Sequence, residues 1–211
     1  MKLYDCSVAP NPRRARMFLA EKGITLAKVE IDILGGANLA ADFLAINPRG
    51  LLPVLELDDG TRIDEVMAIC RYFEELQPEP MLLGRDARER ALVTSRQRKM
   101  EFDGMIAASE VFRNQHAQFA QRSLPGAGAA VLPAIPALVE RGRQTLGRFF
   151  TWLETYLGEA PFVAGECFTM ADITAFCAID FARWVDIDIP ADNVLSHAWY
   201  ARVAARPSAG A

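Results

Sequence analysis

A short stretch near the start of the chain has the residue types that hold an anion. Asn11 is a favoured N-cap residue and Pro12 is favoured at the first helical position, so the pair predicts the start of a helix. A helix N-terminus carries partial positive charge and unpaired N–H groups. Three cationic side chains follow, Arg13, Arg14 and Arg16. A thiolate is one anion that such a site stabilises, because the pKa of a thiol falls there; the alternative is that Asn11 only caps its helix.

A proline at the start of an expected strand marks a second candidate contact. Pro53, in "NPRGLLPVLE", has no N–H to donate to a sheet, so it belongs at a sheet edge or a strand start. A cis Leu52–Pro53 bond would turn the chain sharply and let Leu52 offer its N–H and C=O to an extended peptide ligand. The alternative is an ordinary strand start, and the sequence leaves the isomer open.

Two acidic residues open a third stretch, "DEVMAICRYFEEL". Asp64 and Glu65 at the start of a helix interact favourably with its dipole. A carboxylate in this place can also receive the ammonium group of a ligand. Stabilising the helix is the alternative role, so this stretch alone does not identify a site.

These three stretches lie in a segment that alternates strands and helices. The expected elements are strands at 2–5 and 26–33, a hairpin over 52–63, and helices over 12–22, 37–46 and 65–76. Asp59-Gly60 is the expected hairpin turn. A strand–helix–strand unit pairs in parallel and a hairpin adds antiparallel strands, so the predicted sheet is mixed.

The remainder of the chain shows only helical periodicity. A proline-rich stretch is followed by expected helices over 87–118, 137–157, 171–185 and 192–205. The sequence therefore predicts a mixed α/β domain over 1–80, a linker at 81–86 and an all-helical domain over 87–211. Thr169 and Asp172 have the spacing of a capping box, which we assign to folding rather than to catalysis.

The composition argues against several classes of function. The chain has 211 residues, 51% of them hydrophobic, and its net charge of −4 resides in residues 1–80. Neither residues 1–80 nor residues 81–211 have the positive excess that nucleic-acid binding needs, and the longest uncharged run, 123–139, is interrupted by prolines and too short to span a membrane. The four cysteines form no CxxC pair or zinc-type spacing, so we expect no metal. The charged start MKLYDC and the free thiols indicate a cytoplasmic protein.

Taken together, these stretches resemble the glutathione S-transferase superfamily, bacterial cytosolic type. The matching segments are "LYDCSVAPNPRRARMFLAEKGI", "NPRGLLPVL", "DEVMAICRYF", "FVAGECFTMADITA" and "HAWYARVAARPSA". They occur in the family's order and run from residue 2 to residue 209. The resemblance implies a thioredoxin-like N-terminal domain with a mixed four-stranded sheet, an all-α C-terminal domain, and a homodimer.

The resemblance also implies a role for each stretch. In the family, the residue before the cis-proline pairs its backbone with the cysteinyl part of glutathione, which places Leu52 and Pro53 in the glutathione site. The family's Glu-Ser pair grips the γ-glutamyl end and falls here on Glu65 and Val66. Val66 stands where the family usually has Ser, so a hydroxyl contact is lost while the backbone N–H of Val66 can still donate.

A second departure concerns the residue that meets the sulfur. Ala9 stands where many bacterial members have the thiol-activating Ser, and alanine has no side-chain donor. The candidates are Asn11, whose amide can donate to sulfur, and Ser7, whose hydroxyl is the alternative. We favour Asn11, because a subset of the superfamily resembles this chain in placing Asn two residues past the usual Ser. A third alternative is that the helix N-terminus acts without either side chain.

The electrophilic partner would be held by the helical domain. By resemblance, the end of that domain's first long helix can wall the pocket, which singles out Phe112 and His116; the alternatives are a core Phe and a lone surface His. Phe102, Met105, Phe112 and Phe119 are helically spaced, so they are expected in the core; the alternative is that some of them line an apolar pocket.

The function implied is that of a glutathione transferase with a role in detoxification. The glutathione thiolate would attack an apolar electrophile, with glutathione as a substrate and without a metal. One alternative is a glutathione-dependent reductase of disulfides or peroxides. Another is a non-catalytic interaction protein on the same scaffold, which the substitutions Ala9 and Val66 favour.

Overall fold

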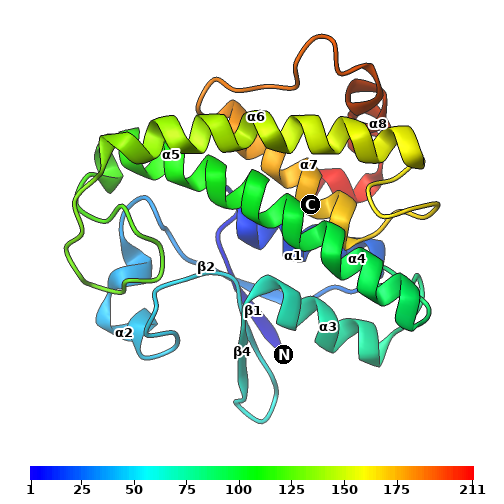
Figure 1. Cartoon of the computed structure of the whole chain (residues 1–211). Helices are drawn as coiled ribbons and strands as arrows, with labels where there is room; N and C mark the ends of the chain where they lie inside the picture. The colour runs from blue at the N-terminus through cyan, green and yellow to red at the C-terminus, as the bar shows by residue number, and fades with distance from the viewer.

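A computed structural model describes residues 1–211 as a small sheet with its helices, followed by a larger helical part (Figure 1). The first part comprises β1 (Lys2–Asp5), α1 (Pro10–Glu21), β2 (Ala27–Glu30), η1 (Ala37–Leu39), α2 (Ala41–Leu44), β3 (Val54–Glu56), β4 (Arg62–Asp64) and α3 (Val66–Leu76). The second comprises α4 (Ala87–Met100), the π-helical turn η2 (Glu101–Ile106), α5 (Ala107–Gln115), η3 (Ala117–Phe119), α6 (Pro136–Glu159), α7 (Met170–Arg183), α8 (Val194–Ala204) and η4 (Pro207–Gly210). This confirms the predicted fold class.

The sheet has four strands in the order β2-β1-β3-β4. β1 and β2 pair in parallel, as a strand–helix–strand unit requires, and β1–β3 and β3–β4 pair antiparallel. Leu3 lies opposite Leu55, and both are fully buried. The predicted mixed sheet is therefore confirmed, although the second strand covers only Ala27–Glu30 and the second predicted helix, 37–46, forms two short turns.

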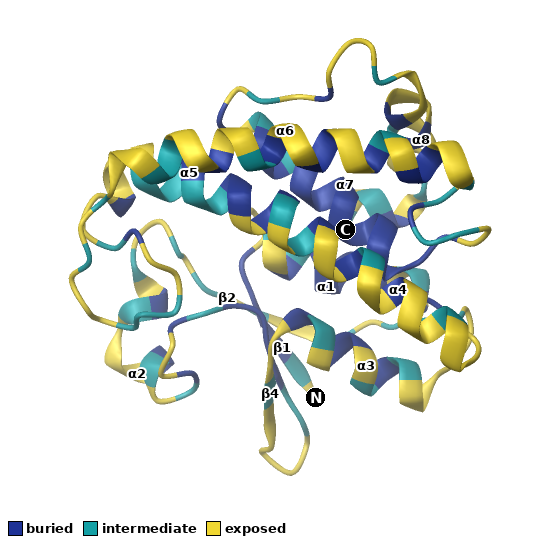
Figure 2. Ribbon diagram, in the orientation of Figure 1, coloured by how far each residue is buried: buried dark blue, intermediate teal, exposed yellow.

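Helix α7 forms the centre of the molecule. Figure 2 shows it buried along almost its whole length, and it packs against α1, α4 and η2. One apolar cluster, which includes Phe18, Leu55, Phe149 and Phe176, runs continuously through both parts of the chain. The two parts share one core, and α7 fixes the relative positions of α1 and η2 because it packs against both.

The predicted capping box at the start of α7 is confirmed. The Thr169 hydroxyl accepts from the Ala171 N–H at 3.3 Å, and the Asp172 carboxylate accepts from the Thr169 N–H at 3.0 Å. Asp172 is fully buried and also accepts from the Val163 N–H and from Trp199 Nε1 at 3.0 and 2.9 Å. Burial raises the pKa of Asp172 to about 6, although these hydrogen bonds oppose the rise.

The long first helix of the C-terminal domain is less regular than predicted. The expected helix over 87–118 ends at Gln115 and contains the π-helical turn η2. Phe102, on this turn, is half exposed, so its assignment to the core was wrong; Met105 and Phe119 are buried as expected. No helix in the structure combines the length and the apolar character that crossing a membrane requires.

Candidate functional site

A groove lies where the N-termini of α1 and α3 approach the loop before β3 and the turn η2. Its lining residues are Asn11, Arg14, Leu51, Leu52, Pro53, Asp64, Glu65, Val66 and Glu101. The enclosed space is only about 40 Å³, which suits one small side chain of a ligand, so the rest of a peptide would lie along the surface. The structure thus brings together five of the predicted site residues, namely Asn11, Leu52, Pro53, Glu65 and Val66.

The first turn of α1 offers a single backbone donor to this groove. The helix begins at Pro10 with Ala9 as N-cap, so the prediction that Asn11 is the N-cap was wrong. Pro10 suits the first helical position as well as Pro12 does, and neither has an N–H. The Arg13 N–H is bonded to the Ala9 carbonyl at 3.1 Å. Asn11 therefore carries the only first-turn N–H without a partner.

The Asn11 side chain has one occupied end and one open end. Its Oδ1 accepts from Arg14 Nη1 at 3.0 Å, whereas its Nδ2 has no partner in the protein. The residue is exposed and lines the groove. Two donors, the N–H and the Nδ2 group, are thus available at the start of α1.

The arginines of α1 do not add free positive charge, contrary to expectation. Arg13 pairs with Asp180 at 2.5 Å, Arg14 with Glu101 at 2.9 Å, and Arg16 with Asp5 at 2.6 Å, as ion pairs. Each acid lies far from its arginine in sequence or on another element, so local sequence does not reveal the pairing. The anion-binding character of the site therefore rests on neutral donors and the helix dipole.

Arg14 is the buried centre of the groove's polar network. Only 1% of the residue is exposed, and its Nη2 donates to the Thr174 hydroxyl at 3.2 Å. Burial works to raise the pKa of Glu101, but the charge of Arg14 and hydrogen bonds from Arg14 and Gln97 outweigh it and lower that pKa. Glu101 is consequently an anion in the folded protein, as its ion pair requires.

Ser7, the alternative to Asn11, lies outside the groove. Its N–H and its hydroxyl both donate to Glu30 on β2, at 2.8 and 3.0 Å. The structure therefore places Ser7 beside β2, at one edge of the sheet, and Asn11 at the groove. The buried thiols of Cys70 and Cys177 offer no other nucleophile, because burial raises the pKa of each to about 12.

The loop before β3 presents an open stretch of backbone. The Leu52–Pro53 peptide bond is cis, and the Leu52 side chain is buried. Neither the N–H nor the C=O of Leu52 has a partner in the protein. This is the geometry that strand-like addition of an extended ligand needs.

The start of α3 is also left uncapped. The helix begins at Val66, one residue later than predicted, and Glu65 as N-cap adopts a left-handed φ of 65°. The N–H groups of Val66 and Met67 have no partner. The Glu65 carboxylate pairs with Arg49 at 3.0 Å, but both side chains are more than half exposed, so the pair is weak. A strained residue beside two free donors is typical of a binding site.

Phe112 and His116 lie next to each other but apart from the groove lining. Their ring centroids are 4.8 Å apart, at the end of α5. Phe112 also contacts the rings of Phe119, Phe181 and Trp184. His116 Nδ1 accepts from the Gln118 N–H at 3.3 Å. Both predicted residues thus belong to an aromatic cluster of the C-terminal domain.

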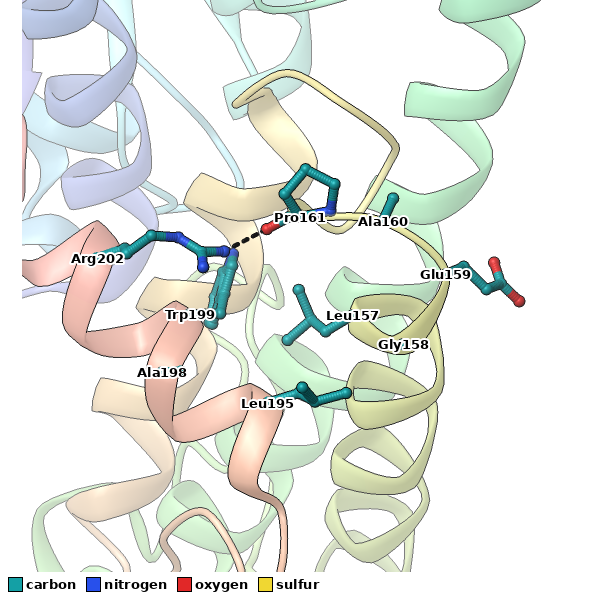
Figure 3. Close-up of a pocket in the computed structure, with 9 residues that line it drawn as sticks. All are labelled: Leu157, Gly158, Glu159, Ala160, Pro161, Leu195, Ala198, Trp199 and Arg202. Carbon is teal, nitrogen blue, oxygen red and sulfur yellow. Dashed lines mark hydrogen bonds between the residues drawn. The ribbon is translucent and has the colours of Figure 1, made fainter.

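A larger cavity, of about 310 Å³, lies elsewhere, between the end of α6 and α8 (Figure 3). Leu157 and Leu195 extend into it, Glu159 points away from it, and Arg202 donates to the Pro161 carbonyl. Arg202, the only cation that lines the cavity, is thus engaged with the backbone. The cavity shares no residue with the groove.

Sequence reasoning missed the roles of Arg14 and Glu101. Asn11 and Arg14 are three residues apart, so their contact on one helix face follows from helical spacing. The contact with Glu101 depends on how α1 and η2 both pack on α7, and no local pattern indicates it.

Comparison with known proteins places this chain among established families. Residues 8–76 match the family "Glutathione S-transferase, N-terminal domain", and residues 136–202 match "Glutathione S-transferase, C-terminal domain". Glutathione S-transferase 2 of Saccharomyces cerevisiae is 34% identical over 99% of this chain and 87% of its own length. The crystal structure of a glutathione S-transferase domain-containing protein of Marinobacter aquaeolei VT8 superposes with a TM-score of 0.91, at 36% identity and 99% coverage of both chains. FtsZ-localized protein A of Caulobacter vibrioides is 27% identical over 97% of this chain and 87% of its own length.

Proposed function

Because this chain belongs to the glutathione S-transferase family and is an enzyme of that class, we propose that it binds glutathione along the groove and activates the thiol at the start of α1. The observation that carries this proposal is the set of unpaired backbone groups in the groove. They lie on Asn11, Leu52 and Val66, which line the groove, and the neighbouring N–H of Met67 is also unpaired; together they match an extended peptide with an anionic end.

The γ-glutamyl end would bind at the start of α3. Its carboxylate would accept from the N–H groups of Val66 and Met67, which carry the partial positive charge of the helix terminus. Its ammonium group would pair with the Glu65 carboxylate in place of, or alongside, Arg49. The missing Ser hydroxyl at Val66 leaves this end held mainly by the backbone.

The cysteinyl residue would lie beside Pro53 and direct its sulfur toward α1. Leu52 would exchange hydrogen bonds with the cysteinyl backbone through its N–H and C=O. The Asn11 N–H and Nδ2 group would then donate to the thiolate and lower the pKa of the thiol. The thiolate sulfur would form a bond to an electrophilic carbon of the second substrate, whose leaving group or π electrons take up the displaced electron pair.

The second substrate would be an apolar electrophile. The aromatic cluster around Phe112 and His116 supports this, because it supplies an apolar surface on the helical domain. We assign the binding of this second substrate to the C-terminal domain.

Two assays separate this function from its rivals. We expect conjugation of glutathione to a chloroarene, measured as thioether formation, to exceed glutathione-dependent reduction of a disulfide. The reverse order would favour the reductase, which the absence of an activating Ser at Ala9 also suits. Retention on immobilised glutathione without either activity would indicate a binding protein.

One relative supports the non-catalytic alternative. The name FtsZ-localized protein A describes localisation rather than catalysis, and that protein shares 27% identity with this chain. Failure to be retained on immobilised glutathione would favour an interaction role of this kind over the transferase.

We also propose a cytoplasmic homodimer. All four cysteines are unpaired, which suits a reducing compartment. Phe102 and Ile106 are about half exposed on η2 and would be covered by a second copy. Sedimentation of the purified protein should give twice the mass of one chain, and a monomer would contradict the proposal.

A further inference from the structure

Arg14 occupies a position that packing alone does not explain. It is a full cation with 1% exposure, and burying a charge is costly unless its partners compensate. An apolar side chain of similar volume would fill the space at lower cost. Arg14 nevertheless lines the groove, and its Nη1 lies between Asn11 Oδ1, at 3.0 Å, and Glu101 Oε1, at 2.9 Å.

We propose that Arg14 is a positioning residue that orients the Asn11 carboxamide so that its Nδ2 group faces the thiol of glutathione; this rests on the function proposed above. Guanidinium groups only donate, so the carboxamide must present its oxygen to Arg14. If the carboxamide rotated by 180°, its Nδ2 group would face the Nη1 group of Arg14, and this hydrogen bond would be lost because both groups are donors. Without Arg14, an exposed asparagine samples both orientations, because its terminal torsion is broad.

The guanidinium is itself fixed from the C-terminal domain. Glu101 on η2 and Thr174 on α7 hold its two Nη groups. Glu101 in turn accepts from Gln97 at 3.1 Å and from Arg98 at 2.5 Å. Arg14 leaves its own buried Nε unpaired while both Nη groups are bonded, so its orientation is set by these outer contacts. Thiol activation on the N-terminal domain would therefore depend on a carboxylate from the helical domain.

Loss of Arg14 should change the activation of the thiol but not the affinity for glutathione. The backbone groups of Leu52, Val66 and Met67 that would hold the peptide form no hydrogen bond with Arg14. In Arg14→Met the amide would lose its fixed orientation, and one net hydrogen bond corresponds to about a fivefold effect. We expect the pKa of the bound thiol to rise by about 0.7 and the dissociation constant of glutathione, measured where the thiol is protonated, to change less than about twofold.

The experiment titrates the thiolate absorbance of bound glutathione between pH 5 and pH 9 in the full-length protein. Arg13→Met is the matched control, because Arg13 also lies on α1 and pairs with an acid on α7, Asp180, yet does not line the groove. We expect the control to lower the melting temperature and leave the pKa of the bound thiol unchanged. An equal rise of that pKa in both variants would overturn the proposal, since it would reflect general loosening of α1.

A double-mutant cycle tests whether Arg14 acts through Asn11. In an Asn11→Ala background, Arg14→Met should raise the pKa of the bound thiol no further. An undiminished second rise would overturn the proposal, because Arg14 would then act on sulfur through its own charge. A normal pKa in Asn11→Ala alone would instead refute Asn11 as the activator in the proposed function, which distinguishes the two failures.

A second variant covers the case in which Arg14→Met does not fold. Glu101 keeps Gln97 and Arg98 as partners in either variant. Arg14→Lys keeps the charge beside Glu101 but gives up the planar guanidinium, whose Nη1 donates to Asn11 and Glu101 while its Nη2 donates to Thr174. The pKa of the bound thiol should again rise. A wild-type pKa in whichever of the two variants is folded overturns the proposal.

Discussion

Helix α7 begins with every first-turn donor bound inside the protein, whereas α1 and α3 begin with donors that face the groove. At α7, the N–H groups of Met170, Ala171, Asp172 and Ile173 all have partners, and Thr169 and Asp172 complete the box. Neither α1 nor α3 has a side-chain cap. At α7 the chain thus supplies a complete cap, whereas at α1 and α3 it leaves backbone donors that a ligand could bind. Helix termini serve the fold in one place and recognition in the other.

The largest effect is expected where the cap is complete. Asp172→Ala would leave the Val163 and Thr169 N–H groups and Trp199 Nε1 buried without an acceptor. At about 1–3 kcal/mol for each unpaired group, the free energy of unfolding should fall by at least about 3 kcal/mol. Denaturant unfolding measures this, with Asn11→Ala as the control that should lose far less. A similar loss of unfolding free energy in Asp172→Ala and Asn11→Ala would contradict the view that the start of α7 serves stability and the start of α1 does not.

The complete cap of α7 should also make the stability of the protein depend on pH, through Asp172. Since the pKa of Asp172 is raised to about 6 in the folded protein, the folded state binds a proton more tightly than the unfolded state does. The contribution of this group to stability is therefore full below about pH 4 and is lost as the pH rises through 6. Asp172→Asn has no carboxyl group to titrate, so its free energy of unfolding lacks this pH dependence. The difference in free energy of unfolding between wild type and variant should therefore narrow between pH 4 and pH 7. A constant gap would mean that the carboxyl group does not titrate in this range.

At the open start of α1, the expected loss is one of activity. Asn11→Ala removes the Nδ2 donor, and losing one preorganised donor to a developing anion typically costs tenfold or more. We expect kcat/KM for a chloroarene to fall about tenfold or more, while Ser7→Ala, whose hydroxyl is bound to Glu30, has little effect. Equally small effects of both substitutions would leave the Asn11 N–H and the helix dipole as the activators.

At the open start of α3, the expected loss is one of affinity. Glu65→Ala removes the proposed partner of the ligand's ammonium group, and its exposed pair with Arg49 adds little to stability. The dissociation constant of glutathione, measured by calorimetry, should rise about five- to tenfold with the melting temperature nearly unchanged. Unchanged affinity would remove Glu65 from the site.

The smallest effect is expected when the family's Ser hydroxyl is restored at position 66. Val66→Ser would add a donor at the uncapped start of α3 but would also remove apolar volume from a buried position. We expect glutathione to bind a few-fold tighter, because one net hydrogen bond is worth about 1 kcal/mol, with some loss of stability. Weaker binding would show that the groove is shaped around the Val66 side chain.

The sequence was most informative where short-range physics decides the structure. Alternating strands, the Asp59-Gly60 turn and the Thr169–Asp172 box all follow from local patterns, and the structure confirms them. The start of α1 was misplaced because Pro10 and Pro12 both suit the first helical position. The pairing of Arg14 with Glu101 depends on packing between residues 87 positions apart, which no local pattern contains.

The two prolines in the first turn of α1 also decide which anions this terminus can accept. Phosphate and sulfate are normally held at helix starts by several amides at once, each reaching a different oxygen. With Pro10 and Pro12 in place, one backbone amide remains to meet an incoming ion. A tetrahedral oxyanion would leave most of its oxygens unbound there, whereas a single sulfur atom needs only one or two donors. This terminus is thereby matched to a monatomic anionic centre, and inorganic phosphate should compete poorly for it.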